Sequence, residues 1–507
     1  MGCRIVTDFD PGYEPREGSR DLTHRDADWS TLRVVVAGLG ISGFAAADAL
    51  SERGAIVTAL SADATPAIIE RARILEILDV DVRLGPEHLR DLPEGAELVV
   101  TSPGLRPDHP MLLAASARGV PVWGEVELAW RMRAESGAAP WITVTGTNGK
   151  TTTVKMLASI LQAAGLRATS AGNVGTPLLE AVLHPEPYDV IAVELSSFQL
   201  HWQRSVRPVA SVCLNVAPDH IDWHGSLEAY SADKAKVYTG TQLACVYNVQ
   251  DPVTQQMVRD ADVVEGCRAI GFTLGIPALS MVGMVDDVLA DRAFVEQRKT
   301  SAAELATLAD LQRHSPSAPP HYVANALAAA ALARAYGVGP LSVRDGLRAF
   351  VPDPHRIADV ATVDGVRFVD DSKATNPHAA AASIVAFEHV VWIAGGLLKG
   401  ADVDALVQSV VDRLRGVVLI GADRQQIARA LARHAPDVPV VDLPNTDTGV
   451  MDLVVARAGD LAQPGDVVLL APAAASMDMF ANYGVRGDAF AEAVRRYASR
   501  DQGPAAS

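Results

Sequence analysis

Cysteine is scarce in this sequence. Four residues, at positions 3, 213, 245 and 267, are spread over a chain of 507 without a CxxC pair. This pattern excludes a disulfide framework and a cysteine-built zinc site, and it favours a reducing compartment, so we expect a cytoplasmic protein. Long apolar runs are missing too. The longest, residues 326–333, is alanine-rich and much shorter than the roughly 20 residues of a membrane-spanning helix, so we expect no membrane span.

An excess of positive charge is also absent. The chain has 44 Lys and Arg residues against 61 Asp and Glu residues, a formal net charge of −17. Non-specific binding to nucleic acid needs a basic surface that displaces counterions, so this composition argues against a nucleic-acid partner. An anionic substrate would need a locally built cationic site. Residues 1–30 are polar and acidic and lack the apolar core of a signal peptide, so we expect a flexible N-terminal extension.

Short apolar runs alternate with helical segments from residue 32 onward, which is typical of α/β domains with parallel sheets. The small, polar residues 134–140 indicate a linker, and Pro352-Asp353-Pro354 indicates a hinge because it cannot continue a helix. These breaks predict three α/β domains in series, at residues 31–138, 139–352 and 353–507. Residues 266–320 are expected to hold only short strands and loops. The expected strands begin near residues 32, 55, 80, 97, 120, 142, 188, 207, 366, 389, 416, 438 and 466.

The stretch TVTGTNGKTTTVKML, residues 143–157, organises the chain. A β-branched run ends in a turn with two glycines, Gly146 and Gly149, and Lys150 then opens a helix. The glycines allow backbone N–H groups to point into one small volume, to which the helix N-terminus adds partial positive charge. A polyphosphate fits there, with Lys150 as a mobile cation and the Thr151 hydroxyl as a Mg²⁺ ligand. Because the spacing is GxxGKT rather than GxxxxGKT, an ordinary strand-to-helix turn stays open as the alternative.

A second glycine-rich turn, GLGISG at residues 38–43, follows the first expected strand. It matches the GxGxxG fingerprint of dinucleotide-binding domains. The acidic residue that should end the second strand is represented only by Asp63, which comes late. NAD and a UDP pyrophosphate therefore both stay open as ligands of this turn. The turn Ser102-Pro103-Gly104, after a later strand, is expected to line the same cleft.

Charged side chains follow two further apolar strands. Glu194 ends one of them, where a carboxylate can hold Mg²⁺ against the phosphates of a nucleotide; a solvated strand end is the alternative. The next strand leads into NVAPDHIDWHG, residues 215–225. Its histidines and aspartates are compatible with a zinc site, with a merely polar loop, or with a role for His220 in binding a hard cation. We favour the role for His220. A helix follows with Lys234 and Lys236 on different faces.

Five central motifs occur together: TVTGTNGKTTT, AGNVG at residues 171–175, ELSSFQL at 194–200, DHIDWHG at 219–225 and Tyr230-x-x-x-Lys234. Together they resemble the central domain of the Mur ligases, ATP-dependent enzymes that extend the peptidoglycan stem peptide. The third domain contains PHR, DDSKATN, AGGLLKGAD and APAAASMDMFANYGVRG, which resemble the D-glutamate-adding branch of that family. The resemblance covers about residues 32–495 in one order.

The resemblance implies both the fold and the reaction. The fold would be a Rossmann-like N-terminal domain that binds UDP, a central P-loop-like ATPase domain with a mostly parallel sheet, and a Rossmann-like C-terminal domain that binds an amino acid. ATP would phosphorylate the carboxylate of UDP-N-acetylmuramoyl-L-alanine, and the amine of D-glutamate would attack the acyl phosphate. ATP and two Mg²⁺ ions are the implied cofactors, because two anions must meet. We expect a monomer.

The resemblance also implies roles for the matching residues. The implied catalytic residues are Lys150, Glu194, His220, Lys234, Arg356 and Lys373. The implied ATP contacts are Gly146, Thr147, Asn148, Gly149, Lys150, Thr151, Thr152, Asn325, Arg356 and Asp371. The implied metal ligands are Thr151, Glu194, His220 and Lys234, the last as a carbamate. The implied substrate contacts are Ile41, Ser42, Ser102, Gly104, Asn173, His220, Thr375, Lys399, Ser476, Met477 and Tyr483.

Other functions use only parts of these motifs. An NAD(P)-dependent oxidoreductase would use GLGISG but leaves the glycine-lysine loop and the third domain unexplained. A nucleotide-driven switch leaves SKATN and the Lys399 loop without a role. Within the ligase class, a sister enzyme for another amino acid or a folylpolyglutamate-type ligase is the alternative. One departure from the family concerns UDP: the enterobacterial pattern has an arginine where this chain has Ser61-Ala62-Asp63.

Overall fold

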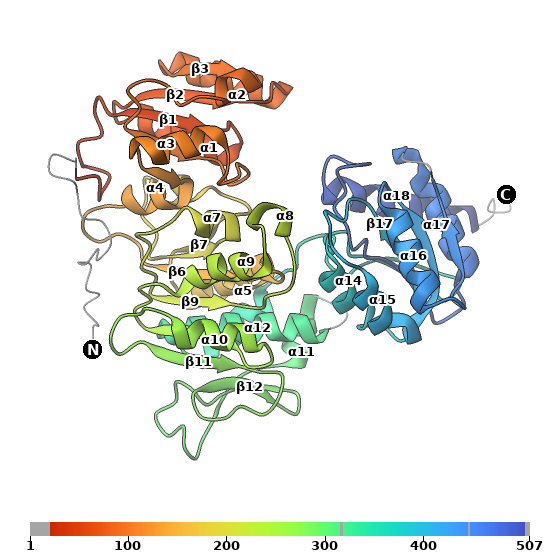
Figure 1. The fold of residues 1–507 in the computed structure, drawn as a ribbon. Coiled ribbons are helices and arrows are strands. Elements are labelled where there is room, and N and C mark those ends of the chain that lie inside the picture. The colour runs from red at the N-terminus through yellow and green to blue at the C-terminus, as the bar shows by residue number, and fades with distance from the viewer. Residues whose placement is uncertain (1–20, 315–317, 445–446, 502–507) are drawn as a thin grey trace, which may run out of the picture. The chain divides into compact units, whose positions relative to one another are not determined.

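The computed structural model of the protein describes residues 21–314, 318–444 and 447–501. The chain forms three α/β sheets in the order of the sequence (Figure 1). The residues form two compact units. One holds residues 21–216, 231–306 and 325–349, and the other holds residues 217–230, 307–314, 318–324, 350–444 and 447–501. None of the described helices is both long and apolar enough to cross a membrane.

The first sheet has the strand order β3-β2-β1-β4-β5, and all its strands are parallel. Its strands are buried apolar runs such as VVVA and LVVT, as expected when helices cover both faces. The order reverses between β1 and β4, so the loops after these two strands meet at one crevice. The elements are β1 (Arg33–Ala37), α1 (Ile41–Ser51), β2 (Ile56–Ser61), α2 (Pro66–Ile77), β3 (Asp81–Leu84), β4 (Leu98–Thr101), α3 (Pro110–Arg118), β5 (Val122–Gly124) and α4 (Glu125–Arg131).

The second sheet has nine strands in the order β14-β13-β12-β11-β10-β9-β6-β8-β7. β6 pairs with both β8 and β9, so the loops after these three parallel strands share the carboxyl edge of the sheet. The strands are β6 (Trp141–Thr145), β7 (Ala168–Gly172), β8 (Val190–Glu194), β9 (Ala210–Cys213), β10 (Ala244–Asn248), β11 (Arg268–Phe272), β12 (Met281–Val285), β13 (Val288–Asp291) and β14 (Ala303–Thr307). The short strands expected over residues 266–320 are found as β11 to β14, although the helix α11 also lies there, and neither β7 nor β10 was predicted.

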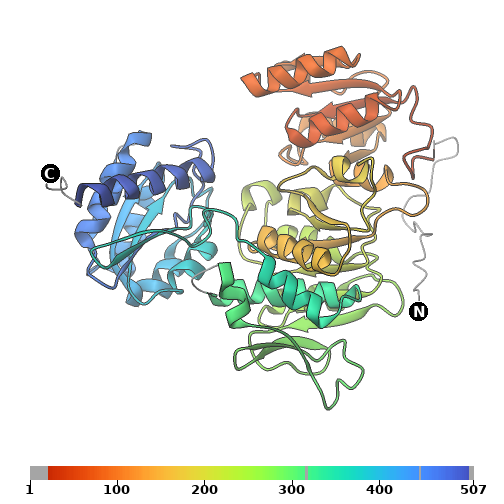
Figure 2. The same cartoon turned by 180° about the vertical axis from the view of Figure 1, so that it is seen from behind.

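Helix α5 packs against strands β6 and β8 of this second sheet. α13 packs against α5 (Figure 2), and the Ser159 Oγ donates a hydrogen bond to the Gly346 carbonyl at 2.7 Å. A Cβ at Gly346 would lie 2.3 Å from the Cα of Ile160, so glycine permits this close approach. The helices between β6 and residue 349 are α5 (Lys150–Ala163), α6 (Leu178–Val182), α7 (Ser197–His201), α8 (Ile221–His224), α9 (Leu227–Ala235), α10 (Pro252–Asp260), α11 (Leu308–Leu311), α12 (Pro320–Ala335) and α13 (Pro340–Ala349), of which α8 and α11 belong to the second compact unit.

The third sheet has the order β15-β16-β20-β17-β18-β19. Its strands are parallel except β15, which runs antiparallel to β16 and was not predicted from the sequence. The loops after the neighbouring strands β16, β20 and β17 lie at one edge. The elements are β15 (Ala358–Val363), β16 (Val366–Asp370), α14 (Pro377–Ile384), β17 (Val390–Gly395), α15 (Asp404–Val410), β18 (Leu414–Ile420), α16 (Arg424–His434), β19 (Val440–Asp442), α17 (Met451–Leu461), β20 (Val467–Leu470) and α18 (Tyr483–Asp501).

Glu125, the first residue of α4, joins the end of the first sheet to α6 of the second. Its carboxylate is 2% exposed, and its Oε1 accepts a hydrogen bond from the backbone N–H of Leu179 at 2.9 Å. Burial raises the pKa of this carboxyl from 4.5 to about 7, although hydrogen bonds from the backbone N–H groups of Leu179 and Leu178 lower it. The neutral carboxyl is therefore favoured up to about neutral pH.

Replacement of Glu125 by Gln is expected to stabilise the protein at alkaline pH. Because the folded-state pKa is raised, the stability that protonation contributes is complete below pH 4.5 and is lost as the pH rises through about 7. Gln mimics the protonated form of Glu125. The free energy of unfolding of Glu125→Gln should therefore exceed that of the parent by at most about 3 kcal/mol at pH 8 and equal it near pH 4.5. Thermal unfolding midpoints from pH 4.5 to 8 measure this. Glu70→Gln, at an exposed residue of α2, is the control, and equal midpoints for Glu125→Gln and the parent at pH 8 would refute the expectation.

Candidate functional site

The loop between β6 and α5 has the backbone that a phosphate cradle requires. Gly146 and Gly149 have φ angles of 152° and 85°, a region that favours glycine. α5 begins at Lys150, and its N-cap residue, Gly149, has no side chain that could cap the first turn; this is the arrangement in which a helix N-terminus binds an anion. The Lys150 Nζ donates to the carbonyl oxygens of Gly146 (2.8 Å) and Thr147 (2.9 Å), which holds the cation over the loop.

Asn215, directly after β9, braces this loop. Its Oδ1 accepts from the Asn148 N–H (2.9 Å), its Nδ2 donates to the Asn148 carbonyl (3.1 Å), and its own carbonyl accepts from the Thr147 N–H (2.9 Å). Three hydrogen bonds therefore fix the turn. Asn215 was not among the predicted site residues. Its place at the end of a buried strand that neighbours β6 is the signal that would have identified it.

Asn325 of α12 lies against the same loop. A Cβ at Gly149 would come within 2.3 Å of the Asn325 Oδ1, so glycine leaves room for this amide. Asn325 is buried, as are Thr151 and Thr152 in the first turn of α5. The structure therefore gathers most of the predicted ATP contacts in one place. These are Gly146, Thr147, Asn148, Gly149, Lys150, Thr151, Thr152 and Asn325.

Lys234 reaches the loop from α9. Its side chain is 1% exposed, and its Nζ donates to the Gly146 carbonyl at 2.9 Å, the same oxygen that accepts from Lys150. Two ammonium groups on one carbonyl concentrate positive charge where the loop would hold phosphate. Lys236, by contrast, is partly exposed and pairs with Asp233 at 2.7 Å. Burial and contact with the loop therefore single out Lys234 of the two lysines.

Glu194 ends β8 beside the loop. Its carboxylate is 1% exposed, and its Oε1 accepts a hydrogen bond from the Asn173 Nδ2 at 2.9 Å. Its Oε2 is buried and has no hydrogen-bond partner within the described part of the chain. The Thr145 Oγ1 donates to the Leu195 carbonyl at 2.7 Å, which ties the ends of β6 and β8 together. An orphaned carboxylate oxygen is costly unless a further group binds it.

These donors fit a magnesium ion rather than a metal cage made of protein alone. Carboxylate and hydroxyl oxygens are hard ligands, and the Glu194 Oε2 and the Thr151 hydroxyl come from the ends of neighbouring elements. Over residues 21–314, 318–444 and 447–501, no group of three or more His, Cys, Asp and Glu residues is placed to hold a metal. Mg²⁺ usually keeps several waters and phosphate oxygens as ligands, so a two-residue contribution is sufficient.

His220 precedes α8, in the second compact unit. It has a φ angle of 52°, and its backbone N–H donates to the Asp219 Oδ1 at 2.9 Å. Its ring Nε2 lies 3.7 Å from the Asp219 Oδ2. The metal and substrate roles of His220 stay predictions, because Lys150, Glu194 and Lys234 belong to the other unit.

Close packing at the crevice of the first sheet requires glycine at two of the three fingerprint positions. Gly38 has a φ of 98°, and a Cβ on it would lie 2.6 Å from the Ser102 Oγ. A Cβ on Gly43 would lie 1.8 Å from the Gly38 carbonyl oxygen. A Cβ on Gly40 would meet nothing within 4 Å, so this glycine faces open space at the N-terminus of α1, where the backbone of this fingerprint approaches a pyrophosphate.

The other predicted contacts of this crevice are accessible. Ile41 is 60% exposed, Ser42 is half-buried and Gly104 is exposed. Arg71 of α2 was not predicted, and its Nη1 donates to the Leu39 carbonyl of the glycine turn at 3.1 Å. It brings a cation to the glycine turn, whereas the family arginine that this chain lacks belongs at residues 61–63, after β2.

Arg356 lies in strained backbone in the second unit. Its neighbours His355 and Ile357 have φ angles of 62° and 47°, which are costly for residues other than glycine and most of all for a β-branched one. The His355 Nδ1 lies 2.6 Å from the Asp370 Oδ2, and the Lys373 N–H donates to the His355 carbonyl at 3.3 Å. These contacts hold the strained segment on the loop after β16.

Asp371 belongs to the same cluster as Arg356. It is buried, and it accepts a hydrogen bond from the Ser383 Oγ. Burial raises the pKa of Asp371 to about 6, although the Ser383 hydrogen bond and the Arg356 charge lower it. The Arg356 Nε is buried and unpartnered as far as the described residues show. A guanidinium with an unused donor suits a phosphate oxygen, so the structure brings two predicted ATP contacts together.

The loops after β16, β17 and β20 hold the residues that were predicted to bind the amino acid. The Lys373 Nζ lies 5.1 Å from the centroid of the Tyr483 ring. Ser476 is buried, whereas Met477 is 62% exposed. Lys399 is exposed with a φ of 52°, and Thr375 is half-buried.

Arg486 of α18 organises these loops and was not predicted. Its side chain is 1% exposed and donates to the Ser372 Oγ (2.9 Å), the Ser372 carbonyl (2.8 Å) and the Ala474 carbonyl (3.1 Å). It therefore ties the loop after β16 to the loop after β20. Burial lowers the pKa of Arg486 to about 10, partly offset by Asp478 and Asp370. A single arginine in a polar helix gives no sequence signal of this role.

Three parallel or mostly parallel sheets in series, with a glycine-lysine loop on the second, define a nucleotide-binding α/β protein of several domains. Three domain families match the chain: the MurD-like N-terminal domain of the Mur ligases (residues 32–124), the Mur ligase middle domain (144–333) and the Mur ligase glutamate ligase domain (355–474). The chain therefore belongs to the Mur ligase family. The three domains expected from the sequence, with their mostly parallel sheets, are confirmed.

Comparison with individual proteins shows which members of the family this chain is similar to. The chain is 62% identical to the UDP-N-acetylmuramoylalanine–D-glutamate ligase of Streptomyces avermitilis, over 92% of this chain and 98% of the relative. It is 60% identical to the protein of that name from Streptomyces coelicolor, over 92% and 99%. The solved structure of the UDP-N-acetylmuramate-alanine ligase from Thermotoga maritima matches 92% of this chain and 99% of its own with a TM-score of 0.54 at 19% identity, which is a likeness of fold.

Proposed function

We propose that this chain is an ATP-dependent ligase that joins D-glutamate to UDP-N-acetylmuramoyl-L-alanine in peptidoglycan precursor synthesis. The observation that carries the proposal is the glycine loop at residues 146–149, on which Lys150 and Lys234 converge beside the orphaned carboxylate of Glu194. Relatives at 60% and 62% identity bear the name of this activity. We place the protein in the cytoplasm as a monomer.

A carboxylate does not acylate an amine in water, because oxide is a poor leaving group. Transfer of the γ-phosphoryl group of ATP to the carboxylate gives an acyl phosphate, from which the amine displaces phosphate. Both reactants of the first step are anions, so alignment and charge neutralisation are the main tasks of the protein. Lys150 and the loop N–H groups would hold the β- and γ-phosphates. Asn325, Arg356 and Asp371 would hold the rest of the nucleotide, and Lys373 would neutralise developing charge.

Bound Mg²⁺ would neutralise phosphate charge and orient the γ-phosphoryl group. Thr151 and Glu194 would hold one ion, which the unpartnered Glu194 Oε2 supports. His220 and a carbamate on Lys234 would hold a second. Asn173, which is exposed beside Glu194, would face the muramoyl-alanine end of the substrate together with His220.

The carbamate gives Lys234 a chemical purpose. An ammonium group has no lone pair for a metal. A neutral Lys234 amine that attacks CO₂ forms an N–C bond and releases one proton, and the product carries two carboxylate oxygens. Burial of the side chain supports this proposal, because desolvation disfavours the charged ammonium.

The third domain would bind D-glutamate. Lys399 supplies a cation, and Thr375, Ser476 and Tyr483 supply hydroxyl groups, a combination that suits a side-chain carboxylate; Met477 would line the same site. The crevice of the first sheet would bind UDP through Ile41, Ser42, Ser102 and Gly104. The open space at Gly40 and the nearby Arg71 support this second assignment.

Phosphate release from ATP tests the proposal, with UDP-N-acetylmuramoyl-L-alanine and each candidate amino acid in turn. D-Glutamate should support release. Release with L-glutamate, D-aspartate or L-lysine should be slower by roughly a hundredfold or more, because each of them misplaces the amine relative to the side-chain carboxylate or lacks that carboxylate. Phosphate release that does not depend on D-glutamate would contradict the proposal. Release that requires a folate substrate and L-glutamate would instead identify the folylpolyglutamate-type alternative.

A further inference from the structure

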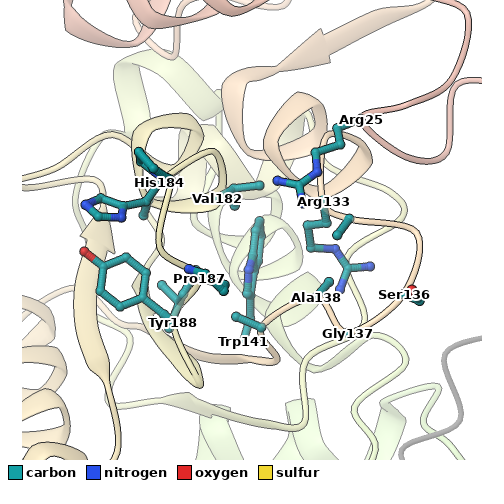
Figure 3. Close-up of a pocket in the computed structure, with 15 residues that line it drawn as sticks. Arg25, Arg133, Ser136, Gly137, Ala138, Trp141, Val182, His184, Pro187 and Tyr188 are labelled. Carbon is teal, nitrogen blue, oxygen red and sulfur yellow. The ribbon is translucent and has the colours of Figure 1, made fainter.

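A cavity of about 190 Å³ lies beside the linker between the first and second sheets (Figure 3). Its walls come from Arg25 before β1, from Arg133, Ala134 and residues 136–139 after α4, from Trp141 in β6, and from Ala181, Val182, His184, Pro185, Pro187, Tyr188 and Ile191 in α6, β8 and the segment between them. None of these is a residue that we assign to ATP, UDP or the amino acid. All belong to one compact unit.

The indole of Trp141 is an unused donor in this cavity. Its side chain is 0% exposed, and its Nε1 has no hydrogen-bond partner among the residues that the structure describes. Figure 3 shows the ring between Arg25 and Arg133 on one side and Tyr188 and His184 on the other. A buried indole N–H normally finds a partner, because leaving it unpaired costs free energy.

Two arginines at the cavity carry charge without an acidic partner. The Arg133 Nε donates to the Trp130 carbonyl at 3.0 Å, and its guanidinium carbon lies 3.2 Å from the centroid of the Trp130 ring. Within the described ranges, neither Arg133 nor Arg25 has a carboxylate at ion-pair distance, and no Asp or Glu lines the cavity. Burial lowers the pKa of Arg133 to about 9. Arg133 is half-buried, and a partly desolvated cation is stabilised by an anion.

The side of the cavity opposite the arginines is largely apolar. Tyr188 and Pro187 lie there together with His184 (Figure 3), and Val182 and Ile191 also line the cavity. A ligand that satisfies both walls has a negative charge at one end and a flat apolar body at the other. We propose that this cavity binds a small aromatic carboxylate, whose carboxylate accepts from the indole N–H of Trp141 and from Arg25 and Arg133. Inorganic phosphate would satisfy the donors and leave the apolar wall unfilled.

The volume suits such a ligand. A cavity of about 150 Å³ lined by apolar side chains holds benzene, whereas a water molecule takes about 30 Å³ in the liquid. Benzoate, with three heavy atoms more than benzene, therefore fits the cavity without expansion. Ordered water is the competing occupant, because the donor side is polar and roomy enough for it.

Isothermal titration calorimetry on the full chain tests the proposal, with benzoate as the probe. Benzoate should bind with 1:1 stoichiometry, and saturating Mg·ATP should not displace it. Benzyl alcohol, which lacks the charge, and inorganic phosphate, which lacks the ring, should each bind at least about tenfold more weakly. Intrinsic tryptophan fluorescence should change on addition of benzoate in the parent and not in Trp141→Phe.

Variants separate this cavity from other anion sites. Arg25→Gln and Arg133→Gln should each weaken the binding of benzoate at least about tenfold, because each removes a charge-assisted hydrogen bond. Arg83→Gln, at an arginine of β3 that pairs with Asp81, should bind like the parent. Displacement of benzoate by ATP, or unchanged affinity in Arg25→Gln together with Trp141→Phe, would overturn the proposal. A crystal structure at saturating benzoate that shows only water in the cavity would do the same.

Discussion

Replacement of Lys150 by alanine should lower turnover by roughly a thousandfold or more. The Lys150 Nζ is held over the glycine loop by the carbonyl oxygens of Gly146 and Thr147, where it would meet the terminal phosphates. A fixed cation that stabilises charge in a phosphoryl transfer supplies a factor of about this size. The loss should fall mainly on kcat, because the loop N–H groups and Asn325 would still bind the nucleotide. Steady-state kinetics with varied ATP measures both constants.

A second lysine on the same helix provides the matched control. Lys155 lies in α5 beyond the first turn and is half-buried, so Lys155→Ala tests whether loss of any α5 lysine harms the enzyme. It should keep kcat within about twofold of the parent. Near-parental kcat in Lys150→Ala would mean that the phosphoryl group is transferred elsewhere. A large loss in both variants would point to damage of the helix instead.

Replacement of Lys234 by alanine should abolish turnover to a similar degree, and small carboxylates should restore part of it. If Lys234 acts as a carbamate, formate or acetate in the space left by the side chain would return an anionic oxygen ligand to the metal. Methylammonium would return only a cation. The rate of phosphate release by Lys234→Ala with each additive measures the difference.

The chemistry of rescue distinguishes the two roles open to this lysine. Recovery with acetate supports the carbamate, whereas recovery with methylammonium and not with acetate would show that the ammonium itself is required. Lys236→Ala is the matched control, because Lys236 is partly exposed and pairs with Asp233. It should keep kcat within about twofold of the parent. Full activity in Lys234→Ala without additive would end the proposal for this residue.

Most strands that are buried on both faces were predictable from the sequence, although β10 (ACVYN), inside the second sheet, was missed. Runs such as VIAV at residues 190–193 of β8 and VVLL in β20 are continuously apolar, so both their position and their parallel pairing could be expected. β7 and β15, with the sequences ATSAG and ADVATV, lack such runs. β7 is an edge strand rich in small residues, and β15 is an antiparallel edge, so neither carries the pattern of a buried strand.

The same distinction holds for the site. The sequence predicts Gly146, Gly149 and Lys150 as site residues, because a phosphate cradle needs those residue types at that spacing. The sequence does not predict Asn215 and Arg486, because both residues hold loops through side-chain hydrogen bonds with residues far away in the sequence. Arg71 shows the same limit, since its contact with the Leu39 carbonyl depends on how α2 packs beside the glycine turn.

Transfer of oxygen from substrate to phosphate tests the central claim most directly. UDP-N-acetylmuramoyl-L-alanine labelled with ¹⁸O in its free carboxylate would be turned over with Mg·ATP and D-glutamate, and the released phosphate would be analysed by mass spectrometry. If the loop that ends at Lys150 delivers the γ-phosphoryl group to that carboxylate, each released phosphate carries one ¹⁸O from the substrate. Amide formation with unlabelled phosphate would show that no acyl phosphate forms, and the account of the site would be wrong.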